Sequence, residues 1–441
     1  MFDGLIAFGH SIASFMTPES IFFALASCLV GVIIGALPGL TATMGVALMT
    51  TLTIKLPSNQ ALLILICTYV GAIYGGSRSA ILLNIPGTPA SAASCLDGYA
   101  LARQGHAGRA MGIATTGSVL GTLIGMFFLA WFTPLLGDLA LKFGAYEFFW
   151  LAVFGVIISA TLSGGDPLKG WISGIAGLFI ATIGQDGIHA YERFAFDNRD
   201  LAGGFALVPA LVGAFGFAEV LIAMKERRPV PQINPFDTVI PKIVDVLKYW
   251  RTVLRSGVIG TFIGIVPGVG EDVAAWSSYA AAKRASDEKE KFGKGSIEGL
   301  MAAETGDNAC VPGAIIPVLT LQVPGSAPAA VLMAAMLIHG VKPGPMIMIE
   351  SPQFVYDVVA MMLFATIGIF IYGLVLTKLL VKVLRVPTTI IVPCCLFSAW
   401  WGPTPCHHGS SMSGPCSSLA CWAMCCGSTN SQSPPWCSAS C

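Results

Sequence analysis

Four short Pro-Gly segments interrupt apolar stretches of the chain, and they are the first places where chemistry could occur. They are Gly35–Thr43, Asn84–Ala90, Gly264–Gly270 and Gln322–Ala329. Proline removes a backbone donor and glycine allows dihedral angles that other residues avoid, so a helix is expected to break there. A helix that begins just after a break presents unpaired N–H groups and the positive end of its dipole. Such ends bind carboxylates and phosphates without a buried Lys or Arg.

We therefore predict a site for an anionic substrate at these breaks. The candidates are the Pro-Gly pairs and the hydroxylated residues near them: Pro38, Gly39, Thr41, Thr43, Pro86, Gly87, Thr88, Pro267, Gly268, Pro324, Gly325 and Ser326. Small side chains leave the backbone accessible, and hydroxyl groups add hydrogen bonds. The alternative is that Thr and Ser cap these helices and do nothing more.

Acidic residues accompany the second pair of breaks. Glu271 and Asp272 follow the third break, whereas Glu304 and Asp307 precede the fourth, with Asn308 beside them. Ionisable residues inside apolar stretches are costly and usually functional, so this set is predicted to coordinate Na⁺ or carry H⁺ as the coupling ion. The alternatives are a first-turn complement to the helix dipole for the first pair and an interfacial loop for the second.

Arg78 is a further charged residue within an apolar region. It could pair with a substrate carboxylate, or it could be an interfacial arginine whose head group reaches the membrane surface.

The order of the breaks indicates an internal repeat. The first and third share the pattern Gly-x-x-Pro-Gly and are 229 residues apart, and the second and fourth are 238 residues apart. Interrupted apolar segments at corresponding positions of two halves are a signature of secondary transporters and point to the binding site. We expect two inverted repeats whose four breaks converge near the middle of the bilayer. The alternative is that Gly and Pro are simply common in membrane helices.

Composition places the chain among membrane proteins. It is 55% hydrophobic and only 11% charged, with a mean hydropathy of +0.75, whereas soluble domains carry about 25% charged residues. We predict an all-α polytopic membrane protein built from Pro-Gly-broken helices or re-entrant hairpins. No Walker A motif, dinucleotide fingerprint or metal-ligand spacing is present, so neither an enzyme, a cofactor nor a metal site is expected.

The predicted organisation has four parts. They are residues 1–224 (first repeat and following transmembrane helices), 225–255 (cytoplasmic linker), 256–392 (second repeat and a following transmembrane helix) and 393–441 (an anomalous tail). Within the third part, basic residues flank Ser256–Ala282 on both sides, which predicts cytoplasmic ends and a re-entrant hairpin with its tip at Pro267-Gly268. In the first part, Ala61–Tyr74 is a short apolar segment that ends in the stretch Tyr74-Gly75-Gly76-Ser77-Arg78-Ser79.

The tail departs from the rest of the chain in composition. From Val386 to Cys441 it has no Asp, Glu, Lys or Arg, yet it holds nine of the thirteen cysteines and four of the nine tryptophans. It has neither a spanning apolar run nor a helical or strand period. Leu and Gly codons of GC-rich DNA give Trp and Cys when read out of frame. We interpret residues 393–441 as the product of a frameshift and expect an unstructured tail.

At its motifs the sequence resembles the large membrane subunit of tripartite tricarboxylate transporters, the TctA family. The stretches that carry the resemblance are Gly35–Thr43, Tyr74–Gly105, Gly264–Arg284 and Glu304–Pro345. The resemblance implies a permease subunit of a secondary importer for tricarboxylates or related carboxylates. The importer is driven by a Na⁺ or H⁺ gradient and lies in the bacterial inner membrane. It also implies two partners, a small TctB-like membrane subunit and a periplasmic, TctC-like solute-binding protein.

Two other classes of function remain open from the residues alone. Re-entrant hairpins also build pores, so an anion-conducting, channel-like protein without ion coupling is the main alternative. A membrane-embedded enzyme would need a pairing of nucleophile and base that the sequence does not offer.

Overall fold

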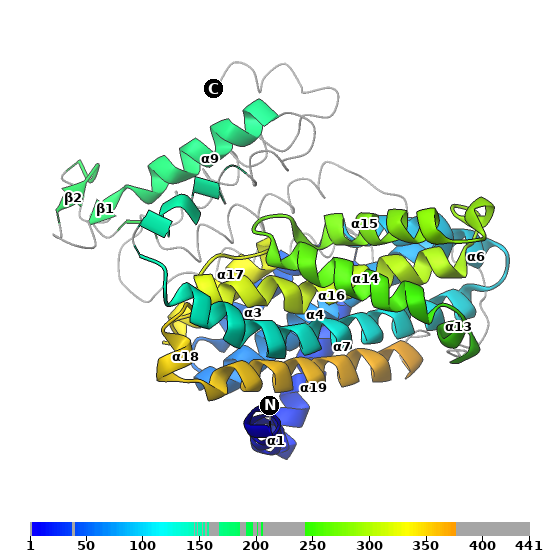
Figure 1. Ribbon diagram of the computed structural model, residues 1–441, viewed down its shortest axis with the longest axis horizontal. Helices are drawn as coiled ribbons and strands as arrows, with labels where there is room; N and C mark the ends of the chain where they lie inside the picture. Colours follow the sequence, from blue (N-terminus) through cyan, green and yellow to red (C-terminus); the bar gives the residue numbers. More distant parts are fainter. Residues whose placement is uncertain are drawn as a thin grey trace. The chain divides into compact units, whose positions relative to one another are not determined.

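The computed structural model describes residues 2–37, 40–144, 167–185, 191–196 and 243–375, with scattered positions between 146 and 205. The chain divides into two compact units. The first unit comprises Met1–Phe148 and Arg228–Pro387, and the second comprises Phe149–Arg227 and Thr388–Cys441. The predicted tail therefore lies outside the described residues, as does most of the predicted linker. Each unit is described by itself (Figure 1).

The first half of the first unit is a series of helices that contains two of the Pro-Gly breaks. Its elements are α1 (Phe2–Phe15), α2 (Pro18–Ala36), α3 (Ala42–Thr53), α4 (Ser58–Leu83), α5 (Ala92–Ser94), the π-helical turn η1 (Cys95–Tyr99), α6 (Ala100–Arg103) and α7 (Ala107–Ala140). The breaks separate α2 from α3 and α4 from α5.

The second half of this unit repeats that order around the other two breaks. Its elements are α13 (Ile243–Lys248), α14 (Trp250–Ile265), α15 (Gly270–Ala285), the 3₁₀ turn η3 (Lys289–Lys291), α16 (Ile297–Leu321), α17 (Ala327–Ile338), α18 (Ile347–Glu350) and α19 (Gln353–Val375). The long helices α4 and α16 occupy corresponding places. Each packs along the helix that precedes the first break of its half, which is α2 for α4 and α14 for α16.

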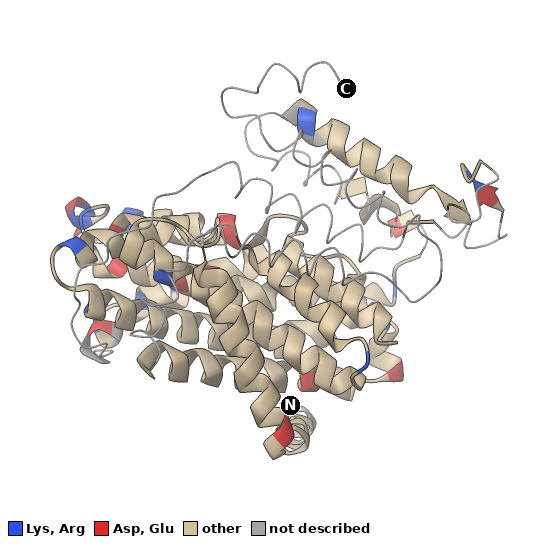
Figure 2. Cartoon of the chain, turned by 180° about the vertical axis from the view of Figure 1, so that it is seen from behind, with Lys and Arg blue, Asp and Glu red and all other residues tan. Residues whose placement is uncertain are grey.

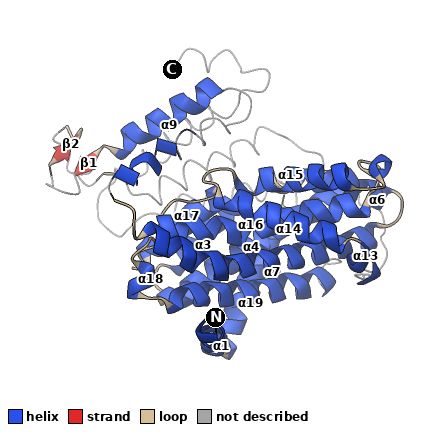
Figure 3. Ribbon diagram, in the orientation of Figure 1, coloured by secondary structure: helices blue, strands red, loops and turns tan. Residues whose placement is uncertain are grey.

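The described part of the second unit is small. It contains α9 (Pro167–Ala181) and a two-residue antiparallel pairing of β1 (Gly184–Gln185) with β2 (Glu192–Arg193). The other secondary-structure elements of the described residues are helices, joined by loops and turns (Figure 3).

Within the described part of the chain, four helices are long and apolar enough to cross a bilayer, namely α2, α4, α7 and α19. A bilayer core of about 30 Å needs roughly 20 residues of helix at ~1.5 Å per residue. The prediction of an all-α, multi-pass membrane protein is in accord with this architecture. Charged residues are sparse along the helices and gather near helix ends and loops (Figure 2).

The third break makes a helical hairpin. The end of α13, which directly precedes α14, lies near the loop after α15, because Lys248 Nζ is 3.3 Å from Glu288 Oε1. Lys291 also contacts this carboxylate, and together the two lysines lower the pKa of Glu288. The two arms thus begin and end at the same side, as expected for a hairpin with its tip at Pro267-Gly268. The hairpin begins at Trp250 rather than at Ser256.

The short apolar segment Ala61–Tyr74 is part of a longer helix. Helix α4 runs unbroken through Gly75 and Gly76 to Leu83. The reason is packing, since a side chain at Gly75 would meet the backbone of Val32 on α2. The glycine lets the two helices approach closely, as small residues do in membrane helices, instead of ending the helix.

Candidate functional site

Three of the four breaks open directly onto a helix of twelve or more residues. Thr41 caps α3, where its Oγ1 accepts the Met44 N–H at 3.3 Å, and Ser326 caps α17, where its Oγ accepts the Ala329 N–H at 3.4 Å. Helix α15 begins at Gly270, directly after the third break. Thr41 and Ser326 thus make the caps that the alternative interpretation describes, whereas their role in substrate binding stays a prediction, and Thr43 lies buried in the first turn of α3. Each cap satisfies only one of the free N–H groups that a helix start presents.

The break at Pro86-Gly87 differs from this expectation. No long helix follows it, because the next element, α5, begins only at Ala92 and has three residues. Thr88 and Ser91 instead close a turn, in which the Thr88 N–H donates to Ser91 Oγ at 3.2 Å and that hydroxyl donates to the Thr88 carbonyl at 2.7 Å. The Thr88 hydroxyl is buried and has no partner.

The two breaks of each half lie against each other in the same way. The Gly87 N–H donates to the Gly76 carbonyl at 3.3 Å, and a side chain at Gly87 would meet the Gly35 carbonyl oxygen. In the second half, the Gly325 N–H donates to the Ala314 carbonyl at 3.4 Å, and a side chain at Gly325 would meet the Gly264 carbonyl oxygen. Both contacts need glycine because backbone approaches backbone.

The remaining break residues are placed as follows. Pro267 is buried and Gly268 is exposed, with a φ of +75° at the hairpin tip that favours glycine. Pro86 and Pro324 are half-buried. Pro38 and Gly39 lie outside the described residues.

A hydrogen-bond chain joins the first half to both breaks of the second half. The hydroxyl of Tyr69, on α4, donates to Glu271 Oε1 at the start of α15 and lies 2.7 Å from the Ser326 hydroxyl. All three side chains are buried. Because the Tyr69 proton goes to the carboxylate, the Ser326 hydroxyl donates to the Tyr69 oxygen.

Glu304 is held by serine hydroxyls from three elements. Its Oε2 accepts from Ser77 on α4 at 2.7 Å and from Ser118 on α7 at 3.0 Å, and its Oε1 accepts from Ser94 on α5 at 2.5 Å. Glu304 is fully buried inside α16. Both carboxylate oxygens of Glu304 therefore have hydrogen-bond donors.

Asp307 lies one helical turn after Glu304 and has no such support. Its side chain is 1% exposed, and neither carboxylate oxygen has a hydrogen-bond partner. Glu304 and Glu271 are close enough to act on it electrostatically. Since an ionised carboxylate without a donor or a counter-ion is strongly disfavoured in an apolar interior, this group is suited to bind a cation or a proton.

Asn308 is orientated by the same network. Its Nδ2 donates to the Ser118 hydroxyl at 3.0 Å and to the Glu304 carbonyl at 3.1 Å, which leaves its buried Oδ1 without a partner. The interfacial-loop alternative for Glu304 and Asp307 is wrong, because both lie within α16. Asp272, by contrast, is exposed in the first turn of α15.

A further buried carboxylate, that of Asp97, joins the two halves away from the breaks. Asp97 of η1 accepts three backbone N–H groups through Oδ1, from Gly293 at 2.8 Å, Gly295 at 2.9 Å and Ser296 at 2.7 Å. Its Oδ2 accepts the Tyr279 hydroxyl at 2.8 Å.

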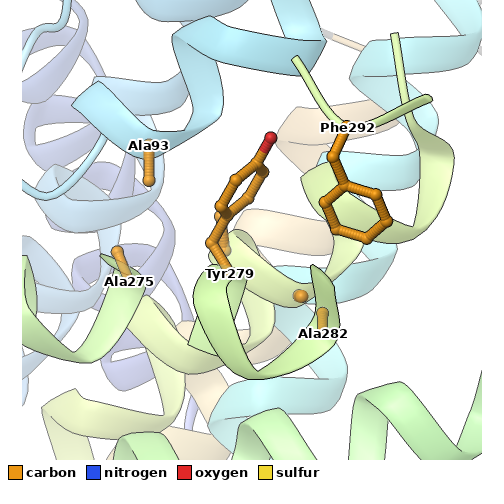
Figure 4. Close-up of a cluster of buried hydrophobic side chains, with 7 residues drawn as sticks. Ala93, Ala275, Tyr279, Ala282 and Phe292 are labelled. Atoms are coloured by element: carbon orange, nitrogen blue, oxygen red, sulfur yellow. The ribbon is translucent and has the colours of Figure 1, made fainter. Parts of the chain in front are cut away.

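Tyr279 packs against Phe292 with ring centroids 5.4 Å apart, in an apolar cluster with Ala93, Ala275 and Ala282 (Figure 4). The hydrogen bonds of Asp97 thus fix the loop that precedes α16. They thereby help to position Glu304 and Asp307, which lie farther along this helix.

The residues that complete the site were not singled out from the sequence. Tyr69 and the three serines around Glu304 are ordinary residues of apolar segments. One signal could have found Tyr69, because it lies 238 residues before Asp307, the separation that also relates Pro86 to Pro324. Tyr69 and Asp307 therefore occupy corresponding positions of α4 and α16.

Comparison with known proteins adds an independent line of evidence. The family model described as "Tripartite tricarboxylate transporter TctA family" matches residues 21–404. The chain belongs to this family. Membership makes it a component of a tripartite tricarboxylate transport system and a multi-pass membrane protein, in accord with the apolar helices of the first unit.

Two relatives come from Agrobacterium vitis. The "Uncharacterized 52.8 kDa protein in TAR-I ttuC' 3'region" is 34% identical over 380 residues, which cover 86% of this chain and 76% of that protein. The "Uncharacterized protein in TAR-II ttuC' 3'region" is 31% identical over 140 residues, or 32% of this chain and 58% of that protein. No solved structure matches the chain.

Proposed function

We propose that this TctA-family chain is the permease subunit of a secondary, ion-gradient-driven importer for tricarboxylates or related carboxylates. It works in the bacterial inner membrane with a small TctB-like membrane subunit and a periplasmic, TctC-like solute-binding protein. The observation that carries the proposal is the meeting of Tyr69, Glu271 and Ser326, which joins a long helix of one half to both breaks of the other.

The substrate site is assigned to the backbone at the breaks. The starts of α3, α15 and α17 supply free N–H groups and the positive ends of three helix dipoles, which favour a carboxylate. We place the substrate there without a side-chain cation. Thr41, Thr88 and Ser326 add hydroxyl groups, of which only that of Thr88 is unpartnered.

The coupling-ion site is assigned to Asp307, with Asn308 as a neutral oxygen ligand. Charge balance supports this choice. Glu304 and Glu271 are both buried and both act electrostatically on buried Asp307, whereas Arg78 is the only buried Lys or Arg among the described residues. A Na⁺ ion or a proton at Asp307 would lower this excess of negative charge. Glu271 is the second candidate, and Asp272, exposed in the first turn of α15, is the third.

Two inverted repeats that move relative to each other would give alternating access to this site. The matched contacts of Gly87 and Gly325 support the equivalence of the two halves, on which this proposal depends.

The test is uptake of radiolabelled citrate into proteoliposomes that contain the chain with both partner proteins. We expect saturable uptake that requires an inward Na⁺ or H⁺ gradient. Saturable uptake that ignores both gradients would reject ion coupling. A non-saturable anion current without the binding protein would favour the channel-like alternative.

A further inference from the structure

Arg78 lies at a place that the substrate and ion sites do not use. Its side chain is fully buried on α4, whose Tyr74 ring lies 4.2 Å from the guanidinium carbon. The prediction of an interfacial arginine with its head group at the membrane surface is therefore wrong. Arginine remains charged in proteins, so a full positive charge lies inside this helical unit.

This guanidinium lacks partners for most of its donors. Nη1 donates to the Met111 carbonyl at 3.3 Å and to the Thr115 hydroxyl at 3.2 Å, both on α7 and both neutral. Nε and Nη2 have no partner at all. A planar guanidinium presents five N–H groups in a fork that matches a carboxylate. Two of its three nitrogens are thus free at a buried position.

The nearest charged groups do not neutralise it. The neighbouring residue Ser77 points to Glu304, and that carboxylate is already held by three serines. The described carboxylates form no ion pair with Arg78. The Tyr74 ring offers a cation–π contact, which offsets only part of the desolvation of a buried charge.

The surroundings of Arg78 are themselves fixed. The Tyr74 hydroxyl lies 2.9 Å from the Thr115 hydroxyl, and a side chain at Gly373 of α19 would meet both residues. Three helices, α4, α7 and α19, therefore enclose the guanidinium.

We propose that Arg78 forms a buried anion site, which binds a carboxylate group or chloride through Nε and Nη2 between α4 and α7. The occupant satisfies the free donors and neutralises the charge. Because Arg78 is fully buried, the anion reaches it only when the interface between α4 and α7 opens. Binding is therefore coupled to a movement of these helices. The site is distinct from the breaks, since its ligand is a side chain and not a helix start.

The test uses the purified full-length chain in detergent, without partner proteins or gradients, so its result does not depend on the transport proposal. The melting temperature is followed by tryptophan fluorescence while sodium chloride, sodium acetate or trisodium citrate replaces sodium methanesulfonate at constant ionic strength. We expect a saturable rise for the wild type, with the apparent Kd raised at least about tenfold in Arg78→Met and by less in Arg78→Lys. Arg109→Lys is the matched control, because Arg109 is already paired with Asp245 at 2.8 Å.

The three salts identify the occupant. A response to chloride and acetate assigns a site for small free anions, whereas a response to citrate alone assigns a subsite for the transported carboxylate. An unchanged response in Arg78→Met would overturn the proposal. The proposal would also be overturned if the melting temperature of the wild-type chain responded to none of the three salts. This measurement does not require any variant to fold.

Discussion

The Ser326 hydroxyl lies 2.7 Å from the Tyr69 hydroxyl, which in turn donates to Glu271. Tyr69 of α4 therefore makes hydrogen bonds at the start of α17 and at the start of α15. In the corresponding position of the other half, α16 carries Asp307, whose carboxylate oxygens have no partner. The two halves thus place a satisfied hydroxyl and an unsatisfied carboxylate at equivalent points. We infer that the two equivalent positions have different roles. Tyr69 holds the two halves together, whereas Asp307 binds the coupling ion.

Replacing Tyr69 by Phe tests the contact between the halves. The change leaves the buried Glu271 carboxylate without its donor, which costs about 1–3 kcal/mol, and the melting temperature is expected to fall. Tyr372→Phe is the control, because it removes a single hydrogen bond of 2.9 Å to the Leu25 carbonyl within the same unit. A Tyr69→Phe chain that is as stable as the Tyr372→Phe chain would contradict a special role for this contact.

The helix caps provide the test of substrate binding. Thr41→Val and Ser326→Val each remove about 1 kcal/mol of hydrogen bonding, so the transport KM is expected to rise roughly fivefold. Thr51→Val on α3 is a suitable control, because its hydroxyl bonds only to the Leu48 carbonyl of its own helix. Normal uptake kinetics in both cap variants, at wild-type expression, would argue against a substrate site at these helix starts.

Asp307 and Glu304 are expected to respond differently to loss of charge. Asp307→Asn removes an unsatisfied carboxylate, so the protein should remain stable while uptake loses its dependence on the coupling ion. Glu304→Gln places an NH₂ group against serine donors and should lower the melting temperature, by about 1–3 kcal/mol of stability. The measurements are melting curves, and uptake at varied external Na⁺ and pH.

Asp272→Asn is the control for the Asp307 and Glu304 variants, because Asp272 is exposed. This change should weaken the ion dependence of uptake only slightly. If Asp307→Asn kept the full ion dependence, Asp307 would not be the coupling site. A response of uptake to the proton gradient alone would assign these groups as proton carriers.

The hydrogen bonds of Asp97 predict a loss of stability that is unrelated to transport chemistry. Asp97→Asn turns an acceptor of four hydrogen bonds into a group that is partly a donor, and it removes the charge that the three backbone N–H groups face. We expect a loss of about 3 kcal/mol, seen as a lower melting temperature. Asp287→Asn, an exposed residue on the same loop, should have no effect. Equal melting temperatures for the two variants would show that the hydrogen bonds of Asp97 are dispensable.

Local patterns in the sequence were sufficient for some of these features. Proline and glycine act through their own backbone restrictions, so the caps at Thr41 and Ser326 and the hairpin tip at Pro267-Gly268 could be predicted. Glycine has a different role at Gly75-Gly76, where it serves contact with α2 inside a continuous helix. Whether a glycine ends its helix or lets that helix pack closely against a neighbouring helix depends on residues far away in the chain.

Side-chain partners were the features that the sequence could not supply. The serines that hold Glu304 lie on three other elements, and nothing in their local pattern marks them. Arg78 was predicted to reach an interface because long side chains usually do, and its burial depends on how α7 crosses α4. The inverted orientation of the repeats and the frameshifted tail remain predictions, and the tail lies outside the described residues.

The final prediction concerns the equivalence of the two halves. Gly87→Ala would press a methyl group against the Gly35 carbonyl oxygen, and Gly325→Ala would do the same at Gly264. Because both obstacles are backbone atoms, the breaks must move apart, and each variant should lose roughly 1–3 kcal/mol of stability together with most of its transport. Gly9→Ala on α1 meets no atom within 4 Å and should be neutral or slightly stabilising. Melting curves and uptake are measured on the same preparations. If the halves are equivalent repeats, the Gly87 and Gly325 variants will lose similar amounts; a large loss at one position with none at the other would refute that equivalence.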